Sequence, residues 1–493
     1  MEQQSKKPIL VTGATGYVGG RLIPRLLDAG YSVRAMVRDP SRLQGRSWID
    51  QVEIYKGDVL QPETLFPALE GVDVAYYLIH SMMAGTGFHQ RDQRAAHSFA
   101  AAAKKGEVRK IIYLGGLGDP NADLSDHLRS RQQTGTALQS AGVHVLEFRA
   151  GVIVGAGSAS FEMIRYLTER VPIMISPRWV YTRTQPISIG NILDYLTAAV
   201  EFPLDDHQVV EIGGPQVLSY EDMLRGYARI RGLRRAILPV PILTPRLSSY
   251  WVHWVTPIPA ALARPLIEGL RNEVIVHDHQ AQQLFPSVKL TPYDQAVEVA
   301  LSSLHASNVE SAWSDALANT QGDEAPLQLT THDGMIIERR TLEVPAPISD
   351  VFQAYTSLGG QKGWLYADWA WRLRGIIDRL IGGVGFRRGR RDPNDLRTGD
   401  ALDFWRVEEL NPNRKLLLRA EMKVPGRAWL QFESSPLDPG KTFLQQTAFF
   451  APKGLSGLLY WYALYPIHAR IFSGLIRGVG KLASLPKTHS GSM

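Results

Sequence analysis

A turn with regularly spaced glycines lies near the start of the chain. Gly13, Gly16 and Gly19 stand three residues apart, directly after the apolar run Ile9–Val11 and before a helical pattern. Gly13 would allow a tight turn, Gly16 would let backbone N–H groups approach a diphosphate, and Gly19 would let the helix pack on the strand. We therefore predict a dinucleotide site. The residues expected to form it are Gly13, Thr15, Gly16, Tyr17, Val18 and Gly19.

The choice of cofactor depends on the end of the next apolar run, Ser32–Val37. That run ends in Arg38, where a carboxylate would usually hold a ribose 2′-OH. A guanidinium instead pairs well with the oxygens of a 2′-phosphate. We expect NADP(H) in preference to NAD(H). Further positions expected along the cofactor are Asp58, Val59, Leu78 and His80.

Strand-like and helical patterns alternate up to about residue 155. This alternation predicts an α/β fold with a doubly wound parallel sheet that binds ligands at the carboxyl ends of its strands. Residues 1–155 would form the nucleotide-binding core of a domain spanning 1–305, and residues 156–305 mainly its substrate side. The expected strands are Ile9–Val11, Ser32–Val37, Val52–Tyr55, Val74–Leu78, Lys110–Leu114 and Val143–Phe148.

The pattern changes in the last third of the chain. Residues 306–330 are polar and are expected to form a linker. Residues 331–485 contain short alternating strands with Pro–Gly turns, and this pattern predicts an α+β domain with a curved antiparallel sheet gripping a helix. The expected strands include Gly334–Leu342, Ala401–Glu408, Lys415–Met422, Ala428–Glu433 and Thr442–Phe449. The tryptophans Trp364, Trp369 and Trp371 leave two interpretations open, core packing or the lining of a site for an apolar ligand.

Composition excludes several classes of protein. The 493 residues are too many for one ordinary core, and the absence of cysteine excludes disulfides and thiolate metal sites. No signal peptide and no metal-ligand spacing are visible, so we expect a cytoplasmic protein without a metal. The net charge is +6, and the basic residues are scattered along the sequence apart from the cluster Arg387–Arg391. This scattered distribution argues against nucleic acid as a partner. Peripheral membrane contact through Leu458–Tyr462, Ile471 and Phe472 is less favoured than core packing of the same residues.

Several motifs carry a resemblance to a known superfamily. The chain resembles the atypical and extended short-chain dehydrogenase/reductases, in particular their NmrA-like, NAD(P)-binding branch, over roughly residues 8–305. The resemblance rests on Thr12–Gly19, Gly57–Val59, Arg149–Gly155, Gln185–Ile189 and Gly213–Pro215. Residues 335–480 look like the helix-grip superfamily of lipid-transfer and polyketide-cyclase (START-like) domains. The whole resembles bacterial proteins that fuse an NmrA-like domain to an uncharacterised C-terminal domain.

The pair of residues that usually accompanies this superfamily is missing. Its reductases use Tyr-x-x-x-Lys, but none of the 18 tyrosines here has lysine four residues later. His127 and Arg131 stand at the two expected positions, and the hydroxyl residue expected after Tyr113 is absent. His127 could exchange a proton while Arg131 anchors the ribose. The same pattern equally suits a domain that binds nucleotide without turnover.

Three functions therefore follow from the sequence. The first is an atypical NADPH-dependent oxidoreductase that transfers hydride to an apolar carbonyl or quinone, with His127 as the catalytic residue. The second is a non-catalytic NAD(P)H redox sensor or assembly factor. The third is a carrier of lipids or other hydrophobic ligands.

Overall fold

The computed structural model describes residues 7–43, 46, 48–79, 88–240, 267–302, 327–332, 334–360, 363–380 and 396–485. The chain divides into two compact units, Met1–Gln321 and Gly322–Met493. Most of the expected linker 306–330 lies outside the described residues. The same holds for His80 and for the basic cluster Arg387–Arg391.

The first unit is built on a seven-stranded sheet in which every neighbouring pair is parallel. Its strand order is β11-β6-β5-β4-β1-β2-β3. This confirms the parallel doubly wound sheet expected from the sequence, and the six expected strands are all present. The strands are β1 (Ile9–Thr12), β2 (Val33–Val37), β3 (Glu53–Lys56), β4 (Val74–Tyr77), β5 (Lys110–Gly116), β6 (His144–Ala150) and β11 (Gln208–Ile212).

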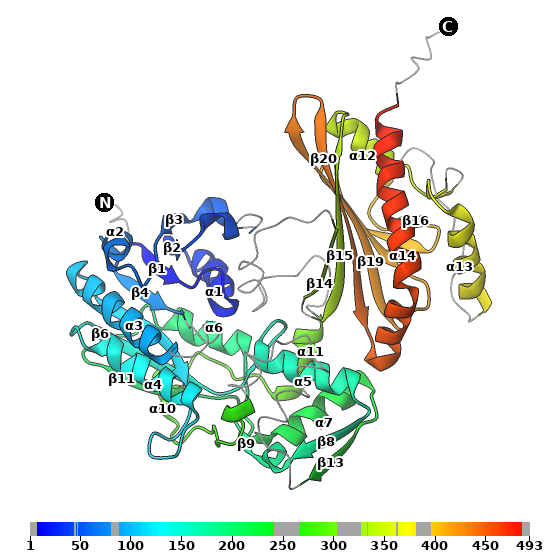
Figure 1. The fold of residues 1–493 in the computed structure, drawn as a ribbon. Helices are drawn as coiled ribbons and strands as arrows, with labels where there is room; N and C mark the ends of the chain where they lie inside the picture. The colour runs from blue at the N-terminus through cyan, green and yellow to red at the C-terminus, as the bar shows by residue number, and fades with distance from the viewer. Residues whose placement is uncertain are drawn as a thin grey trace. The chain divides into compact units, whose positions relative to one another are not determined.

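Helices cover both faces of this sheet, each through an apolar core (Figure 1). On one face lie α1 (Tyr17–Asp28) and α6 (Ile189–Ala198). On the other lie α2 (Leu65–Leu69), α3 (Phe88–Lys105) and α4 (Asp126–Gln139). Strands buried on both sides explain the nearly continuous apolar runs in the sequence.

The rest of the first unit packs around a separate apolar cluster. In this part, α7 begins with a capping box in which Ser219 and Asp222 satisfy each other's backbone N–H groups. The helices of this part are α5 (Ala159–Arg170), α7 (Tyr220–Arg231) and α11 (Tyr293–Ser302), while α10 (Gln280–Leu284) packs in the core that also contains α1 and α6. The short strands of this part are β7 (Ile153–Val154), β8 (Ile173–Pro177), β9 (Arg183–Thr184), β10 (Ile187–Ser188), β12 (Leu218–Ser219) and β13 (Ala236–Val240).

The second unit is an antiparallel seven-stranded sheet with the order β14-β15-β20-β19-β18-β17-β16. The long helix α14 packs on it, as expected from the sequence (Figure 1). The strands are β14 (Leu327–His332), β15 (Met335–Val344), β16 (Ala401–Leu402), β17 (Trp405–Asn411), β18 (Lys415–Ala420), β19 (Gly426–Asp438) and β20 (Lys441–Pro452). The helices are α12 (Ile348–Thr356), α13 (Asp368–Leu380) and α14 (Gly454–Ala483).

The second unit differs from the sequence prediction at two places. The run Ala401–Glu408, expected as one strand, is divided into β16 and β17, because Asp403 takes a φ of 55° and turns the chain. The sheet also begins at Leu327 rather than after residue 331.

Most of the tryptophan group belongs to the core of this unit. The rings of Trp364 and Trp371 lie 5.0 Å apart between centroids, and both are buried. Trp364 Nε1 donates to Asp403 Oδ2 at 2.9 Å. Trp369 instead points outward and is 71% exposed.

Only some of the C-terminal residues that we considered for membrane contact pack inward, since Leu459 and Tyr462 are 63 and 54% exposed. Leu458, Trp461 and Phe472 of α14 are buried in the apolar clusters of this unit. Among the residues that the structure describes, no helix combines the length and apolar character needed to cross a bilayer.

A partly buried histidine, whose Nδ1 atom is inaccessible to solvent, gives the second unit a testable pH dependence. The ring of His468 lies between Trp461 and Phe472, with centroid distances of 5.5 and 5.8 Å. Burial, aided by the charge of Arg374, lowers the pKa of His468 to about 4. The unfolded chain therefore binds the proton more readily than the folded one, and stability falls as the pH drops from about 6.5 towards 4.

We expect His468→Gln to remove this acid sensitivity. Between pH 7 and about 4.5, the free energy of unfolding of the wild type should fall by about 2–3 kcal/mol more than that of the variant. Urea unfolding followed by circular dichroism at several pH values measures the difference. Equal pH slopes for the two proteins would show that the imidazole does not titrate in this way.

Candidate active site

The glycine-spaced turn connects β1 to α1 through very close backbone contacts. Gly13 has a φ of +69°, and a Cβ atom there would lie 2.6 Å from the carbonyl oxygen of Leu78. A Cβ atom on Gly19 would lie 2.3 Å from the carbonyl oxygen of Gly13. Real Cβ contacts are never this short, so both positions require glycine.

The turn is also fastened to the neighbouring strand. Thr12 Oγ1 donates to the carbonyl of Tyr76 at 2.9 Å and accepts from the Leu78 N–H at 3.1 Å. These bonds join β1 to β4 at the place where the strand order reverses, which is where open α/β sheets bind ligands.

The start of α1 suits an anion. Gly16 is its N-cap, no side chain caps the helix there, and its first turn holds no acidic residue. The N–H groups of the first turn and the positive end of the helix dipole therefore face the turn without a competing carboxylate. This cradle fits a diphosphate.

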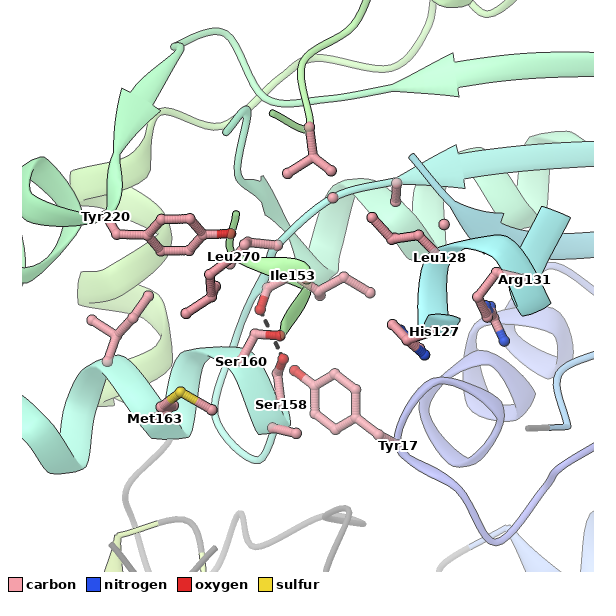
Figure 2. A pocket seen from close by; sticks show the side chains of 18 of the residues that line it. Tyr17, His127, Leu128, Arg131, Ile153, Ser158, Ser160, Met163, Tyr220 and Leu270 are labelled. Atoms are coloured by element: carbon pink, nitrogen blue, oxygen red, sulfur yellow. Dashed lines mark hydrogen bonds between the residues drawn. The ribbon is translucent and has the colours of Figure 1, made fainter. Parts of the chain in front are cut away.

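A cavity of about 640 Å³ extends from this turn into the rest of the first unit (Figure 2). It passes the carboxyl end of β5 and the first turn of α4, and it continues between α5, β8 and α7. The lining residues in that inner part are largely apolar. They include Met163, Ile164, Leu167, Met174, Leu224 and Leu270.

Hydroxyl groups occupy one side of the cavity. Figure 2 shows the hydroxyl of Tyr17 pointing towards Ser158 and Ser160. Ser158 Oγ donates to the carbonyl of Ile153 at 2.8 Å. The Tyr17 hydroxyl lies so close to the chain that a Cβ atom on Gly155 would stand 2.4 Å from it.

His127 and Arg131 line the cavity one helical turn apart on α4. The Arg131 guanidinium donates to the carbonyl of Leu114 and lies 5.2 Å from the centroid of the Tyr113 ring. Tyr113 in turn donates from its hydroxyl to the carbonyl of Arg131 at 2.9 Å. These contacts hold the cation at the end of β5.

Tyr113 itself cannot serve as an acid at neutral pH. Its side chain is fully buried, and burial raises its pKa to about 12. Among the residues considered from the sequence, His127 lines the cavity and is of the side-chain type that most often serves as a proton donor or acceptor in enzymes.

A buried carboxylate explains why no hydroxyl residue follows Tyr113. Glu147 of β6 lies behind Gly115, where a Cβ atom would approach Glu147 Oε1 to 2.7 Å. Gly135 of α4 gives room to the same carboxyl group, since a Cβ atom there would lie 2.2 Å from Oε2. Burial raises the pKa of Glu147, although Arg149 donates to it at 2.8 Å.

The structure brings some of the predicted residues together and not others. Seven of them line the cavity: Gly16, Tyr17, Val18, Gly19, Leu78, His127 and Arg131. Five lie outside its lining: Gly13, Thr15, Arg38, Asp58 and Val59. Arg38 directly follows β2 and is exposed, while Asp58 follows β3 and accepts from the Leu60 N–H at 3.0 Å.

The apolar inner part of the cavity was not found from the sequence. Its residues come from α5, β8 and α7, and no motif marks them. Burial of Tyr220, which also lines this part, raises its pKa well above the ordinary value, so that its hydroxyl stays protonated. Among the described residues, no group of three acidic or histidine side chains could hold a metal ion.

Comparison with known proteins identifies the first unit more closely. Residues 13–141 match a family model described as NAD(P)H-binding. Residues 331–475 match a model described as a protein of unknown function (DUF2867). The second match gives no support to the expected helix-grip superfamily, which stays a prediction.

Two of the curated relatives match about half of this chain. Ceramide reductase of Caulobacter vibrioides is 26% identical over 250 residues, which cover 49% of this chain and 76% of that protein. Photosystem II assembly factor Ycf39 of Cyanophora paradoxa is 25% identical over 257 residues, covering 50% and 76%. The structure of Citrobacter sp. triphenylmethane reductase complexed with NADP(H) has a TM-score of 0.49 and 18% identity, over 59% of this chain and 99% of that one.

These findings confirm the broad prediction for the first unit. It contains an NAD(P)H-binding domain with a Rossmann-like parallel sheet, and its relatives include reductases. The glycine turn and the first turn of α1 thus form a binding site for a nicotinamide dinucleotide.

The substitution Gly19→Ala, which adds a single methyl group, tests the contact between α1 and the turn. We expect Gly19→Ala to lower the affinity for NADPH by about tenfold or more, because the added Cβ pushes the helix start away from the turn. Isothermal titration calorimetry measures the loss. The matched control is Gly190→Ala on α6, where the nearest atom to a new Cβ, apart from its immediate chain neighbours, would be Ser188 Oγ at 3.7 Å. Equal affinities for both variants would contradict the role of this contact.

Proposed function

We propose that this chain is an NADPH-dependent reductase that delivers hydride to the carbonyl group of an apolar molecule, such as a long-chain ketone or a quinone. One observation carries the proposal. A single cavity runs from the dinucleotide turn, past His127 and Arg131, into a chamber with apolar walls. Such a cavity can hold a cofactor and an apolar acceptor side by side.

The predicted cofactor residues have separate tasks in this proposal. Gly13, Gly16 and Gly19 hold the diphosphate, together with the backbone at Thr15, Tyr17 and Val18. Arg38 pairs with the 2′-phosphate at the end of β2, and Asp58 and Val59 lie towards the adenine. Leu78 and Arg131 lie along the ribose of the nicotinamide.

When bound, NADPH supplies a hydride for the carbonyl carbon and becomes NADP⁺. The chain supplies position and a proton. Apolar side chains such as Met163 and Leu270 exclude water and hold the acceptor. His127 donates a proton to the carbonyl oxygen, which yields an alcohol, while Arg131 stays fixed by Leu114 and Tyr113.

The relatives support an apolar substrate without identifying it. One of them is named a ceramide reductase, and a ceramide is a lipid. The apolar lining of the inner cavity suits an acceptor of this chemical class, and the described residues of that lining include no cluster of charges for a sugar nucleotide.

A second function is favoured by two specific observations. The Tyr-x-x-x-Lys pair is absent, and one relative is named a photosystem II assembly factor. Under this alternative, the chain binds nicotinamide dinucleotide without turnover and reports its redox state to a partner. Turnover by the purified chain separates the two functions.

We expect the purified full chain to oxidise NADPH in the presence of long-chain ketones or quinones. His127→Ala should lower kcat by about 10²-fold or more, because it removes the proton donor, and should leave NADPH affinity unchanged. The matched control is His97→Ala. His97 lies on α3 outside the cavity lining, with Nδ1 2.8 Å from Ser140 Oγ. Tight NADPH binding without turnover across the whole panel would favour the sensor function instead.

The role of Arg38 predicts a change in cofactor preference. Arg38→Ala should weaken NADPH binding by about 10- to 100-fold, because the 2′-phosphate loses a charged partner. NADH binding should change little. Arg25→Ala is the control, since Arg25 lies near the far end of α1 and is half-exposed. Calorimetry with both cofactors measures the ratio, and equal losses for NADPH and NADH would show that Arg38 does not contact the 2′-phosphate.

A further inference from the structure

The helix α13 of the second unit is apolar on the face that it turns outward. Its inward side is formed by Trp371, Gly375 and Asp378, which are buried and spaced as one helical face. Its outward side carries an apolar stripe. The stripe consists of Trp369, Leu373, Ile376, Ile377 and Leu380, with exposed fractions of 71, 49, 55, 45 and 81%.

This arrangement is unusual for a helix at a protein surface. Such helices are normally polar on the outward side, and a run of exposed apolar side chains marks a surface that contacts something else. Trp369, Leu373, Ile376 and Leu380 follow one another by three or four residues. They form a line roughly 16 Å long on one side of the helix.

The neighbouring helix α14 has the same character. Tyr366, in the turn before α13, packs on Gly474 of α14, and Trp371 lies 6.3 Å from Phe472 between ring centroids. The N-terminal half of α14 carries no charged residue up to Arg470, and it exposes Leu459 and Tyr462 by 63 and 54%.

Cations outnumber carboxylates on the two helices. The acidic groups of α13 are both engaged, because Asp368 pairs with Arg372 at 2.8 Å and Asp378 accepts from the Lys423 N–H at 2.6 Å. The 30 residues of α14 include no carboxylate at all. The described cations on the two helices are Arg372, Arg374, Arg470, Arg477 and Lys481.

We propose that the apolar stripe of α13 docks this chain on an anionic phospholipid bilayer, with the helix lying in the plane of the interface. Apolar and indole side chains enter the boundary between headgroups and acyl chains, and arginines bind lipid phosphates. The excess of cations without free carboxylates is complementary to a negatively charged surface. This surface differs from the α14 residues singled out in the sequence, several of which are buried.

The test uses the full chain and co-sedimentation with vesicles. We expect binding to mixed phosphatidylglycerol and phosphatidylcholine vesicles, much weaker binding to phosphatidylcholine alone, and release at high salt. Leu373→Ser/Ile376→Ser should lower the bound fraction on anionic vesicles by about tenfold or more. The matched control, Leu60→Ser/Val299→Ser, changes side chains in the first unit that are 42 and 54% exposed and should bind like the wild type.

Three results would overturn the proposal. The first is a wild type that does not bind anionic vesicles, and the second is a double variant that binds them as well as the wild type. The third is a wild-type dimer, seen by light scattering without lipid, that Leu373→Ser/Ile376→Ser separates into monomers. In that case the stripe would be an interface between two copies of the chain. Circular dichroism and thermal unfolding verify that the variants are folded.

Discussion

The close approach of α1 to the turn after β1 is the contact on which the first unit's site depends. Two backbone carbonyls, those of Leu78 and Gly13, occupy the space where side chains would begin at positions 13 and 19. The helix start can therefore reach the sheet at the point where the strand order reverses. Without this contact the cavity would lose its entrance wall, because Gly16, Tyr17, Val18 and Gly19 all line it.

A second steric constraint explains how this site departs from the pattern of the superfamily that the sequence resembles. Glu147 is buried behind the end of β5, and glycines at 115 and 135 make room for its carboxyl group. A serine at 115 would collide with that carboxyl, so the missing hydroxyl residue and the buried acid belong together. Arg131 is likewise engaged by β5, through the carbonyl of Leu114. Gly115, Gly135 and Arg131 thus determine how α4 packs on the sheet, and His127 of the same helix lines the cavity.

The sequence predicted what local spacing and periodicity determine. The glycine turn, the parallel strands and the alternation of β15 to β20 each depend on residues near in sequence, and each was located to within a few residues. The inner chamber could not be predicted, because Met163, Met174, Leu224 and Leu270 meet only through tertiary packing and resemble core residues in the sequence. The division at Asp403 was missed because a single aspartate, although it tolerates a positive φ, does not by itself mark a turn within an alternating run. The sequence also could not distinguish Trp369 from Trp371. The two residues lie on different faces of α13, so that Trp369 is exposed to solvent and Trp371 is buried in the core.

The two proposals concern different units but share one chemical argument. A reductase whose substrate is a lipid must obtain that substrate from a bilayer, because lipids have very low free concentrations in water. Such an enzyme requires an apolar chamber beside the cofactor turn, where the reaction takes place, and a surface that binds the bilayer, such as the apolar stripe of α13. Neither feature depends on the other for its evidence, since the chamber lies in the first unit and the stripe in the second. Loss of vesicle binding in a protein that still reduces a water-soluble quinone would assign the two tasks to separate parts of the chain.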